Sequence, residues 1–402
     1  MTPEGISASG IQRGKTAPVD SVKVTPPVDP KEIDPDEDAP PGGIALCLSG
    51  GGYRAMLFHL GTLWRLNELG YLPKLDRVSS VSGGSITAGV LALNWSRLEF
   101  DESGVGRQFE PFVVAPVRRL GEKTIDVPSV LRGVFGFGSI GDKVANAYRK
   151  HLFGAATLQD FPSHPFFVLN ATNMQSGVLW RFTKAYTWDY RVGQIEKPRI
   201  ELAVAVAASA AFPPVLSPVT LKLNDSNFTP KTGRDLQRPP YTTRVVLTDG
   251  GVYDNLGLET AWKRCHTILI SDAGGNLKPE ENPKGDWLRH TLRNLFIIDN
   301  QVRSLRRRNI MDAYDVKNRL GAFWSIRTDI QNYRLPRYPL DCPFEKTIRL
   351  ANLATRLKGL PPETQERLIN WGYAVCDAAM RKHVDGSLPE PTAFPYPNAG
   401  IG

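Results

Sequence analysis

The sequence predicts an α/β fold with a mostly parallel central sheet. Twice in succession, over residues 44–69 and 76–93, a short apolar run is followed by a glycine-rich turn and then by apolar residues at helical spacing. Strands that are connected through helices lie parallel in one sheet. Further apolar runs at 166–169, 244–247 and 267–270 indicate that the sheet continues late into the chain.

The composition is that of a globular protein. Hydrophobic residues make up 41% and charged residues 22% of the 402 positions, which excludes a fibrous or globally disordered chain. The net charge of +8 favours anionic partners such as a membrane face, although solubility alone accounts for it equally well. Apart from the short run Arg306–Arg308 there is no basic block, so we expect no nucleic-acid partner.

The four cysteines are scattered without metal-ligand spacing. We therefore expect no disulfide scaffold, no metal and no cofactor. The first residues lack an apolar signal core, and no stretch approaches the roughly 18 apolar residues that cross a bilayer. The expectation is a cytoplasmic protein that associates with membranes peripherally, with nothing to indicate its oligomeric state.

Composition changes along the chain predict its organisation. Residues 1–41 are rich in proline and charge and are predicted to be a disordered tail, followed by a single domain over 42–402. The pattern loosens over 98–160, which we interpret as an insertion and a candidate lid. A helical C-terminal region is predicted over 285–385.

Within that region, residues 287–308 form a predicted amphipathic helix. Two interpretations are open. A stripe of this kind most often packs on the protein's own core, which we favour, but it also suits a helix lying on an anionic membrane. The apolar positions of the stripe are Leu288, Leu292, Leu295, Phe296 and Ile298.

A serine follows the second predicted strand. A serine on a sharp turn between strand and helix exposes its hydroxyl, and the crowded backbone there requires small neighbours. Ser82 fits, with Gly84 two positions beyond it. The usual GxSxG pattern has glycine where this chain has Ser80, a residue small enough to be tolerated. On this motif alone an ordinary turn is the commoner explanation.

The glycines Gly50, Gly51 and Gly52 lie between the first strand and its helix. Their amide groups at a helix N-terminus suit an oxyanion hole. They would suit a phosphate equally, so a nucleotide-binding module is an alternative, although neither GxxxxGK[ST] nor GxGxxG with its acidic partner is present. Arg54 could support an anionic headgroup, brace the loop, or be a surface arginine.

A nucleophilic serine needs a base. None of the six histidines stands at a predicted strand-end loop with glycines, whereas Asp249 does, followed by Gly250 and Gly251. Asp272, in a similar strand-end setting, competes with it. The residues themselves leave both aspartates open, together with a simple turn-capping role.

In combination these elements resemble the patatin-like phospholipases and the related catalytic domain of cytosolic phospholipases. The similarity rests on SGGGxR at 49–54, the serine at 82, Asp-Gly-Gly at 249–251 and the block ASAAFPPVLSP at 208–218. It therefore extends over 44–275.

The resemblance implies a three-layer α/β/α sandwich and calcium-independent hydrolysis of acyl esters in phospholipids or other glycerolipids. It implies that Ser82 is the nucleophile and that Asp249, rather than Asp272, is the base of a dyad without histidine. The substrate would be met at a transient anionic membrane surface. A lipid-binding or regulatory protein without turnover, and an acyltransferase, are the alternatives.

Overall fold

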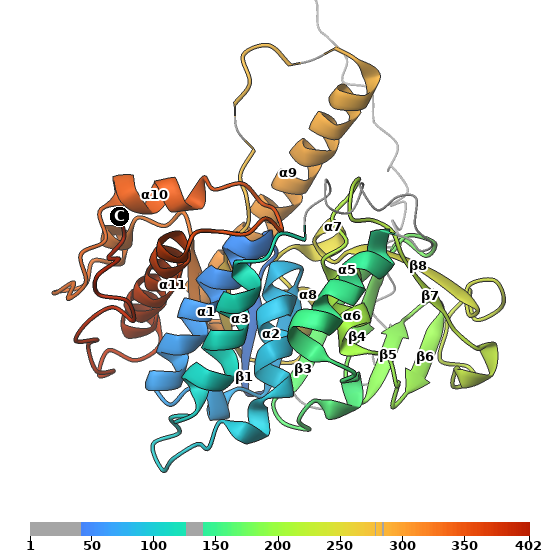
Figure 1. Cartoon of the computed structure of the whole chain (residues 1–402), viewed down its shortest axis with the longest axis horizontal. Coiled ribbons are helices and arrows are strands. Elements are labelled where there is room, and N and C mark those ends of the chain that lie inside the picture. Colours follow the sequence, from blue (N-terminus) through green and yellow to red (C-terminus); the bar gives the residue numbers. More distant parts are fainter. Residues whose placement is uncertain (1–41, 126–139, 278, 284) are drawn as a thin grey trace, which may run out of the picture. The chain divides into compact units, whose positions relative to one another are not determined.

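The computed structural model describes residues 42–125, 140–277, 279–283 and 285–402. Its centre is a ten-stranded sheet with the order β10-β9-β1-β2-β3-β4-β5-β6, to which β8 and β7 are joined at β3 (Figure 1). The tail predicted over 1–41 lies outside the described residues, as does part of the insertion predicted over 98–160.

Five strands form the parallel part of the sheet. They are β1 (Ile44–Leu48), β2 (Arg77–Val81), β3 (Phe166–Asn173), β9 (Thr267–Asp272) and β10 (Leu320–Ser325). Each buried run that the sequence assigned to a strand is one, and β1 and β2 are each followed by a glycine turn and a helix. The predicted α/β fold with parallel central strands is confirmed.

The remaining strands pair antiparallel. They are β4 (Leu179–Phe182), β5 (Tyr186–Asp189), β6 (Gly193–Glu196), β7 (Val219–Lys222) and β8 (Arg244–Asp249). Of these strands the sequence pattern predicted β8, at 244–247, and missed the other four, because runs of four residues are too short to show a clear period. β8 in particular runs against β3, and this direction decides the geometry of the site.

Helices cover both faces of the sheet, which gives three layers. Alternate residues of a strand point to opposite faces. Leu46 and Leu48 of β1 join the larger core, whereas Ala45 and Cys47 join a second core with Ile310. Nearly all these side chains are fully buried, so burial on both faces explains the continuous apolar runs in the sequence.

The helices over the larger core include α1, α2, α3, α5, α6 and α11 (Figure 1). Their bounds are α1 (Gly52–Glu68), α2 (Gly83–Leu93), α3 (Ala115–Gly121), α5 (Ile140–Tyr148), α6 (Leu202–Ser209) and α11 (Pro362–His383). The other α-helices among the described residues are α7 (Gly251–Asp254), α8 (Glu259–Trp262), α9 (Trp287–Asp315) and α10 (Phe344–Ala351). Among the described residues, no helix is both long and apolar enough to cross a membrane.

The C-terminal helix α11 packs lengthwise against α1. Arg65 of α1 is almost fully buried and donates to Asp377 of α11 at 2.7 Å. Because α1 begins at the glycine loop, this ion pair fixes the helix whose N-terminus faces the site. The interpretations of 42–402 as one domain and of 98–160 as a lid stay predictions.

Candidate active site

The pairing of β3 places Ser82 and Asp249 together. Ala171 and Thr172 of β3 pair with β4 and also with β8, so β4 and β8 lie on opposite edges of β3. Leu169 and Asn170 of β3 likewise pair with both β2 and β4, so β2 also lies on the edge opposite β4. β2 and β8 therefore share one edge of β3. On that edge Val81 pairs with Asn170, and Asp249 pairs with the next residue, Ala171. The two strands therefore meet end to end, at the residue before Ser82 and at Asp249.

The backbone at Ser82 is strained. Its φ of 53° and ψ of −120° lie outside the regions that side chains favour, a conformation that a sharp strand-to-helix turn imposes on the residue it presents. Ser82 also lies at the N-terminus of α2, where the helix dipole favours negative charge. Its side chain is nearly buried.

Polar residues beneath the turn hold this conformation. The Ser82 amide donates to Ser209 Oγ at 3.1 Å, and Ser209 Oγ in turn donates to the Asn170 carbonyl at 2.6 Å. Ser85 Oγ lies 2.8 Å from Ser209 Oγ and 3.0 Å from Ser80 Oγ. The serine that replaces the usual glycine is thus accommodated because its hydroxyl is satisfied. Sequence reasoning missed Ser209, although it flagged the block that contains it.

Asp249 is a buried carboxylate with few partners. Its Oδ1 accepts from the Gly251 amide at 2.7 Å, while its Oδ2 is buried without a hydrogen bond among the described residues. Burial raises the pKa of Asp249 to about 7, against the lowering effects of the Gly251 amide and the neighbouring Ser82 hydroxyl. This effect of Ser82 is that of a hydroxyl directed at the carboxylate, so the two side chains are neighbours. A carboxyl that titrates near neutrality can exchange a proton with an adjacent hydroxyl.

The glycine loop faces the serine turn. A Cβ added to Gly50 would lie 3.1 Å from Ser82 Cβ and 2.4 Å from Asn255 Oδ1, so only glycine permits this approach. The Gly50 amide donates to the Asn255 carbonyl at 3.1 Å and is therefore engaged. For the amides of Gly51 and Gly52, no acceptor is found within the described ranges. Of the three amides predicted for an oxyanion hole, these two are free to donate.

The other predicted supporting glycines allow close packing of backbones. A Cβ at Gly84 would lie 2.4 Å from the Leu48 carbonyl oxygen, and one at Gly250 would lie 2.3 Å from the Asn170 carbonyl oxygen. At Gly251 it would lie 2.5 Å from Asn255 Oδ1. Asn255 thus lies between the glycine loop and the Asp-Gly-Gly turn, a link that no sequence motif signalled.

Arg54 braces the loop. Its guanidinium donates to the carbonyls of Leu353 at 2.5 Å and Ala273 at 3.0 Å, and the residue is 3% exposed. Burial, together with the nearby arginines Arg327 and Arg303, lowers the pKa of Arg54 to about 10. Of the three roles considered from the sequence, the contacts support bracing and exclude a surface arginine.

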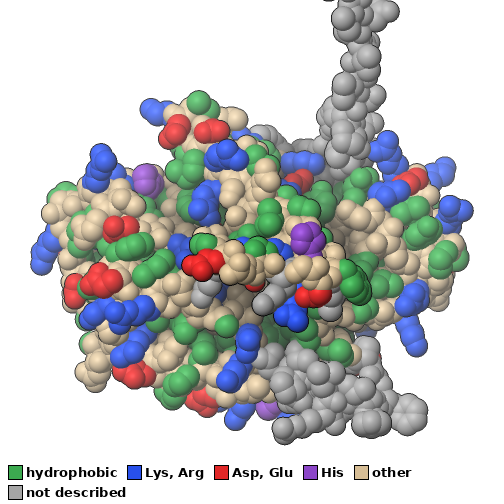
Figure 2. Space-filling view, turned by 90° about the horizontal axis from the view of Figure 1, so that it is seen from above, with side chains coloured by type: hydrophobic (Ala, Val, Ile, Leu, Met, Phe, Trp, Pro, Cys, Tyr) green, Lys and Arg blue, Asp and Glu red, His purple; other side chains and the backbone are tan. Residues whose placement is uncertain are grey.

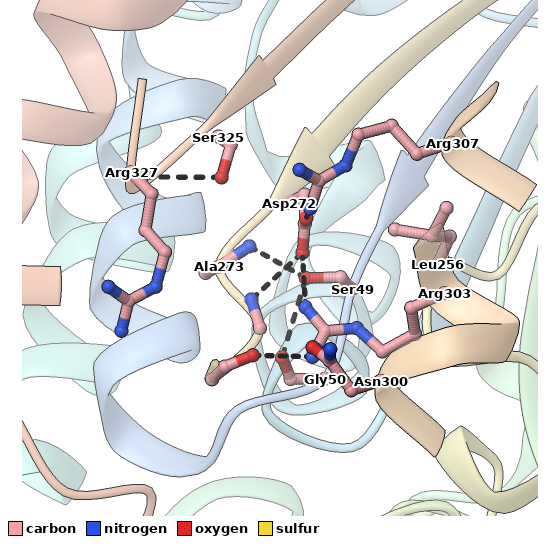
Figure 3. Close-up of polar contacts among 12 residues, drawn as sticks. Ser49, Gly50, Leu256, Asp272, Ala273, Asn300, Arg303, Arg307, Ser325 and Arg327 are labelled. Carbon is pink, nitrogen blue, oxygen red and sulfur yellow. Dashed lines mark hydrogen bonds and ion pairs between the residues drawn. The ribbon is translucent and has the colours of Figure 1, made fainter. Parts of the chain in front are cut away.

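Asp272 lies on the far side of the loop from Ser82, because β1 separates β9 from β2. Arg303 and Arg307 of α9 contact its carboxylate at 3.6 and 3.3 Å (Figure 3). Although its burial acts in the opposite direction, these two arginines, with the Gly274 amide, lower the pKa of Asp272. The next residue, Ala273, donates its amide to Ser49 Oγ at 2.7 Å. Asp272 is therefore a structural anchor for the glycine loop.

No histidine takes the place of a base beside Ser82 in the part of the chain that the structure describes. His59 is the nearest to the glycine loop in sequence, but it is fully buried between Ser271 Oγ at 2.8 Å and the Ser49 carbonyl at 2.9 Å. Burial lowers its pKa to about 4. Its contacts assign it to the support of the loop.

A strained serine at a strand-to-helix turn, a neighbouring buried carboxylate and a glycine loop with free amides define an α/β protein of the nucleophile-elbow class. The family model of patatin-like phospholipases matches residues 46–262, more than half of the chain. The chain belongs to that family. Among curated proteins, none matches it.

Solved structures show distant likeness. Human GIVD cytosolic phospholipase A2 is 12% identical to this chain, with a TM-score of 0.45. The match covers 85% of this chain and 61% of the phospholipase chain. VipD from Legionella pneumophila is 16% identical, with a TM-score of 0.33, and the match covers 85% of this chain and 67% of VipD. A chain in the complex of SpcU with ExoU from Pseudomonas aeruginosa is 14% identical, with a TM-score of 0.25, and the match covers 90% of this chain and 77% of that one. This chain thus spans about three fifths of the cytosolic phospholipase chain, and none of these likenesses assigns a role to its residues.

Proposed function

We propose that this protein is a serine lipid acyl hydrolase that cleaves acyl esters of phospholipids or other glycerolipids with Ser82 and Asp249. The observation that carries the proposal is the end-to-end meeting of β2 and β8 on one edge of β3. It sets a strained serine beside a buried carboxyl whose pKa is about 7. Membership of the patatin-like phospholipase family supplies the class of substrate.

In the first step Ser82 Oγ attacks the ester carbonyl carbon while its proton passes to the ionised Asp249. The negative charge that develops on the carbonyl oxygen is stabilised by the amides of Gly51 and Gly52 at the start of α1. Collapse of this intermediate breaks the bond to the leaving alcohol, which takes the proton from Asp249. The acyl group remains on Ser82.

In the second step Asp249 accepts a proton from water as the water attacks the acyl-enzyme. The same two amides stabilise the second oxyanion, and its collapse releases the fatty acid and returns the proton to Ser82. As the family resemblance implies, we propose hydrolysis without calcium. We also propose that the enzyme meets its substrate by peripheral association with a membrane surface.

The test is incubation of wild type and Ser82→Ala with mixed phospholipids and neutral lipids, followed by mass spectrometry of fatty acids and lysolipids. Loss of Ser82 should remove the products and the labelling by a fluorophosphonate probe, with the fold unchanged by circular dichroism. Asp249→Ala should abolish hydrolysis of both lipids and a short-chain soluble ester, whereas His290→Ala, on an exposed part of α9, should leave hydrolysis of the soluble ester intact. Retention by Asp249→Ala with loss in His290→Ala would overturn the dyad.

The same measurements separate the alternatives. A wild-type serine inert toward the fluorophosphonate would favour a lipid-binding protein without turnover, because such probes report activation of the nucleophile. Transfer of the acyl group to an added alcohol in excess of hydrolysis would favour an acyltransferase.

A further inference from the structure

The helix α9 consists of an anchored part and a part that projects from the protein. Arg303 and Arg307 hold the end of β9 at Asp272, Ile310 lies in the second core, and the Tyr314 hydroxyl donates to the carbonyl of Ile268 at the start of β9 at 2.6 Å. The helix therefore runs antiparallel to β9. Residues 287–302 extend past the carboxyl ends of the strands (Figure 1), by about 24 Å at 1.5 Å per residue.

The projecting part exposes large apolar side chains. Of the 14 exposed large hydrophobic side chains in the described residues, six lie there and three more lie in a turn, a loop and the helix α7, next to the ends of β3 and β8. The six are Trp287, Leu295, Phe296, Ile297, Ile298 and Val302; the three are Met174, Phe212 and Val252. This distribution contradicts the favoured expectation that the stripe packs on the protein's own core, and the reason is that only the C-terminal half of α9 reaches the sheet.

These apolar side chains surround the helix. Leu295, Phe296, Ile297 and Ile298 are consecutive and are 40% to 59% exposed, and at about 100° per residue four consecutive positions point in all directions. A partner helix or a second copy of this chain covers one face of such a helix. Acyl chains of a lipid layer can surround it.

The exposed stretch is continuous with the candidate site. Phe296 stacks on Phe212 with ring centroids 6.3 Å apart and planes within 4°. Phe212 directly follows Ala211, whose carbonyl accepts from the Asp249 amide at 3.0 Å. A lipid layer that surrounds Leu295–Ile298 therefore lies against the rim of the site.

Charge agrees with such a partner. The projecting residues 287–302 carry two arginines, Arg289 and Arg293, against one aspartate, Asp299, and arginine beside apolar residues is typical of helices that bind anionic lipid surfaces. Trp287 begins the helix and is 78% exposed, and tryptophan favours the interface of a bilayer. In the view from above, Lys and Arg side chains lie among apolar ones on this face (Figure 2).

We propose that residues 287–302 of α9, together with Phe212, insert into a phospholipid surface that contains anionic lipid and so hold the rim of the site against its substrate. This inference rests on the proposed function for its substrate class. Because Arg303 and Arg307 anchor α9 to Asp272, and Ala273 contacts the glycine loop (Figure 3), the inserted helix and the loop are parts of one connected structure.

The test measures binding apart from turnover. In a Ser82→Ala background, which hydrolyses nothing, Ile297→Gln/Ile298→Gln is compared with Met311→Gln/Val316→Gln. The second pair removes exposed apolar side chains from the anchored end of α9 and from the residue that directly follows the helix. Cosedimentation with phosphatidylcholine vesicles, with and without phosphatidylglycerol, gives the partition coefficient.

The first pair should lower the partition coefficient about tenfold or more, and the second pair should leave it within about twofold of the background. In active protein, the first pair should raise the vesicle concentration that gives half-maximal hydrolysis, with the rate on a short-chain soluble ester unchanged. Equal vesicle binding by both pairs would overturn the inference, as would a wild-type dimer that the first pair dissociates without loss of vesicle binding. Because the binding assay needs no catalysis, failure of the proposed function would appear separately, as absent turnover of the soluble ester.

Discussion

Asp249 and Asp272 provide a direct test of the reasoning about the base. Both aspartates end a strand, both are buried and both precede a glycine turn. Burial raises the pKa of Asp249, whereas Arg303 and Arg307 overcome the effect of burial and lower the pKa of Asp272. The isosteric variants Asp249→Asn and Asp272→Asn should therefore change stability in opposite directions.

The magnitude for Asp249 follows from linkage. In the unfolded chain this carboxyl titrates near 3.8, and in the folded protein near 7. The folded protein therefore binds the proton of Asp249 more tightly than the unfolded chain does. The ionised carboxylate lowers the free energy of unfolding, and this loss is absent below pH 3.8 and complete above pH 7. The gap corresponds to at most about 4 kcal/mol. At pH 8 the free energy of unfolding of Asp249→Asn should exceed that of wild type by part of this amount. The difference should shrink as the pH falls toward 4.

For Asp272 the sign is reversed. Its folded pKa lies below that of the unfolded chain, so its stabilising contribution is present above 3.8 and is lost as the pH falls through the folded value. Asp272→Asn should lose about 3 kcal/mol at neutral pH, because Arg303 is 8% exposed and would retain a poorly compensated charge.

Chemical denaturation of both variants and wild type at pH 4 and pH 8 measures these differences, with hydrolysis of a soluble ester measured in parallel. Asp249→Asn should be inactive at both values. If it were as destabilised at pH 8 as Asp272→Asn, Asp249 would be a paired structural carboxylate, and its assignment as the base would lose its physical support.

Three further predictions concern the site and its scaffold. Because Asp249 must be ionised to accept a proton, kcat/KM on a soluble ester should rise with pH through about 7 and be about tenfold lower at pH 6 than on the plateau; a flat profile would contradict this. Gly50→Ala should reduce kcat about 100-fold by displacing the loop, while Gly285→Ala, where a methyl group meets open space, should not. Arg65→Ala should lower the free energy of unfolding by roughly 3–5 kcal/mol by breaking its buried ion pair with α11; in the same denaturation experiment, Arg107→Ala, from an exposed pair, should change it by less than about 1 kcal/mol.

Much of the fold was accessible from the sequence because its signals are local. The apolar runs of β1 and β2, the glycine turns after them and the periodicity of α1 and α2 lie within short windows. The order of the motifs from 49 to 251 identified the family. The helix over 287–308 was also predicted, since its stripe has the helical period.

The sequence left undecided whatever depends on pairings between distant segments. Asp249 and Asp272 look alike along the chain, and only the register of β3 with both β2 and β8 brings Asp249 to the serine turn. The engagement of the Gly50 amide by Asn255 is likewise a contact across some 200 residues, with no motif to signal it.

The sequence by itself thus determined the βα units, the serine turn and the family, because spacing and residue type within short segments encode them. The family resemblance favoured Asp249 over Asp272, but only the tertiary structure gave the physical reason, which is that the end of β8 meets the end of β2, and only it decided whether the stripe of α9 is covered. The physical reason is the same in both cases: strand register and the reach of a helix are set by packing between remote parts of the chain.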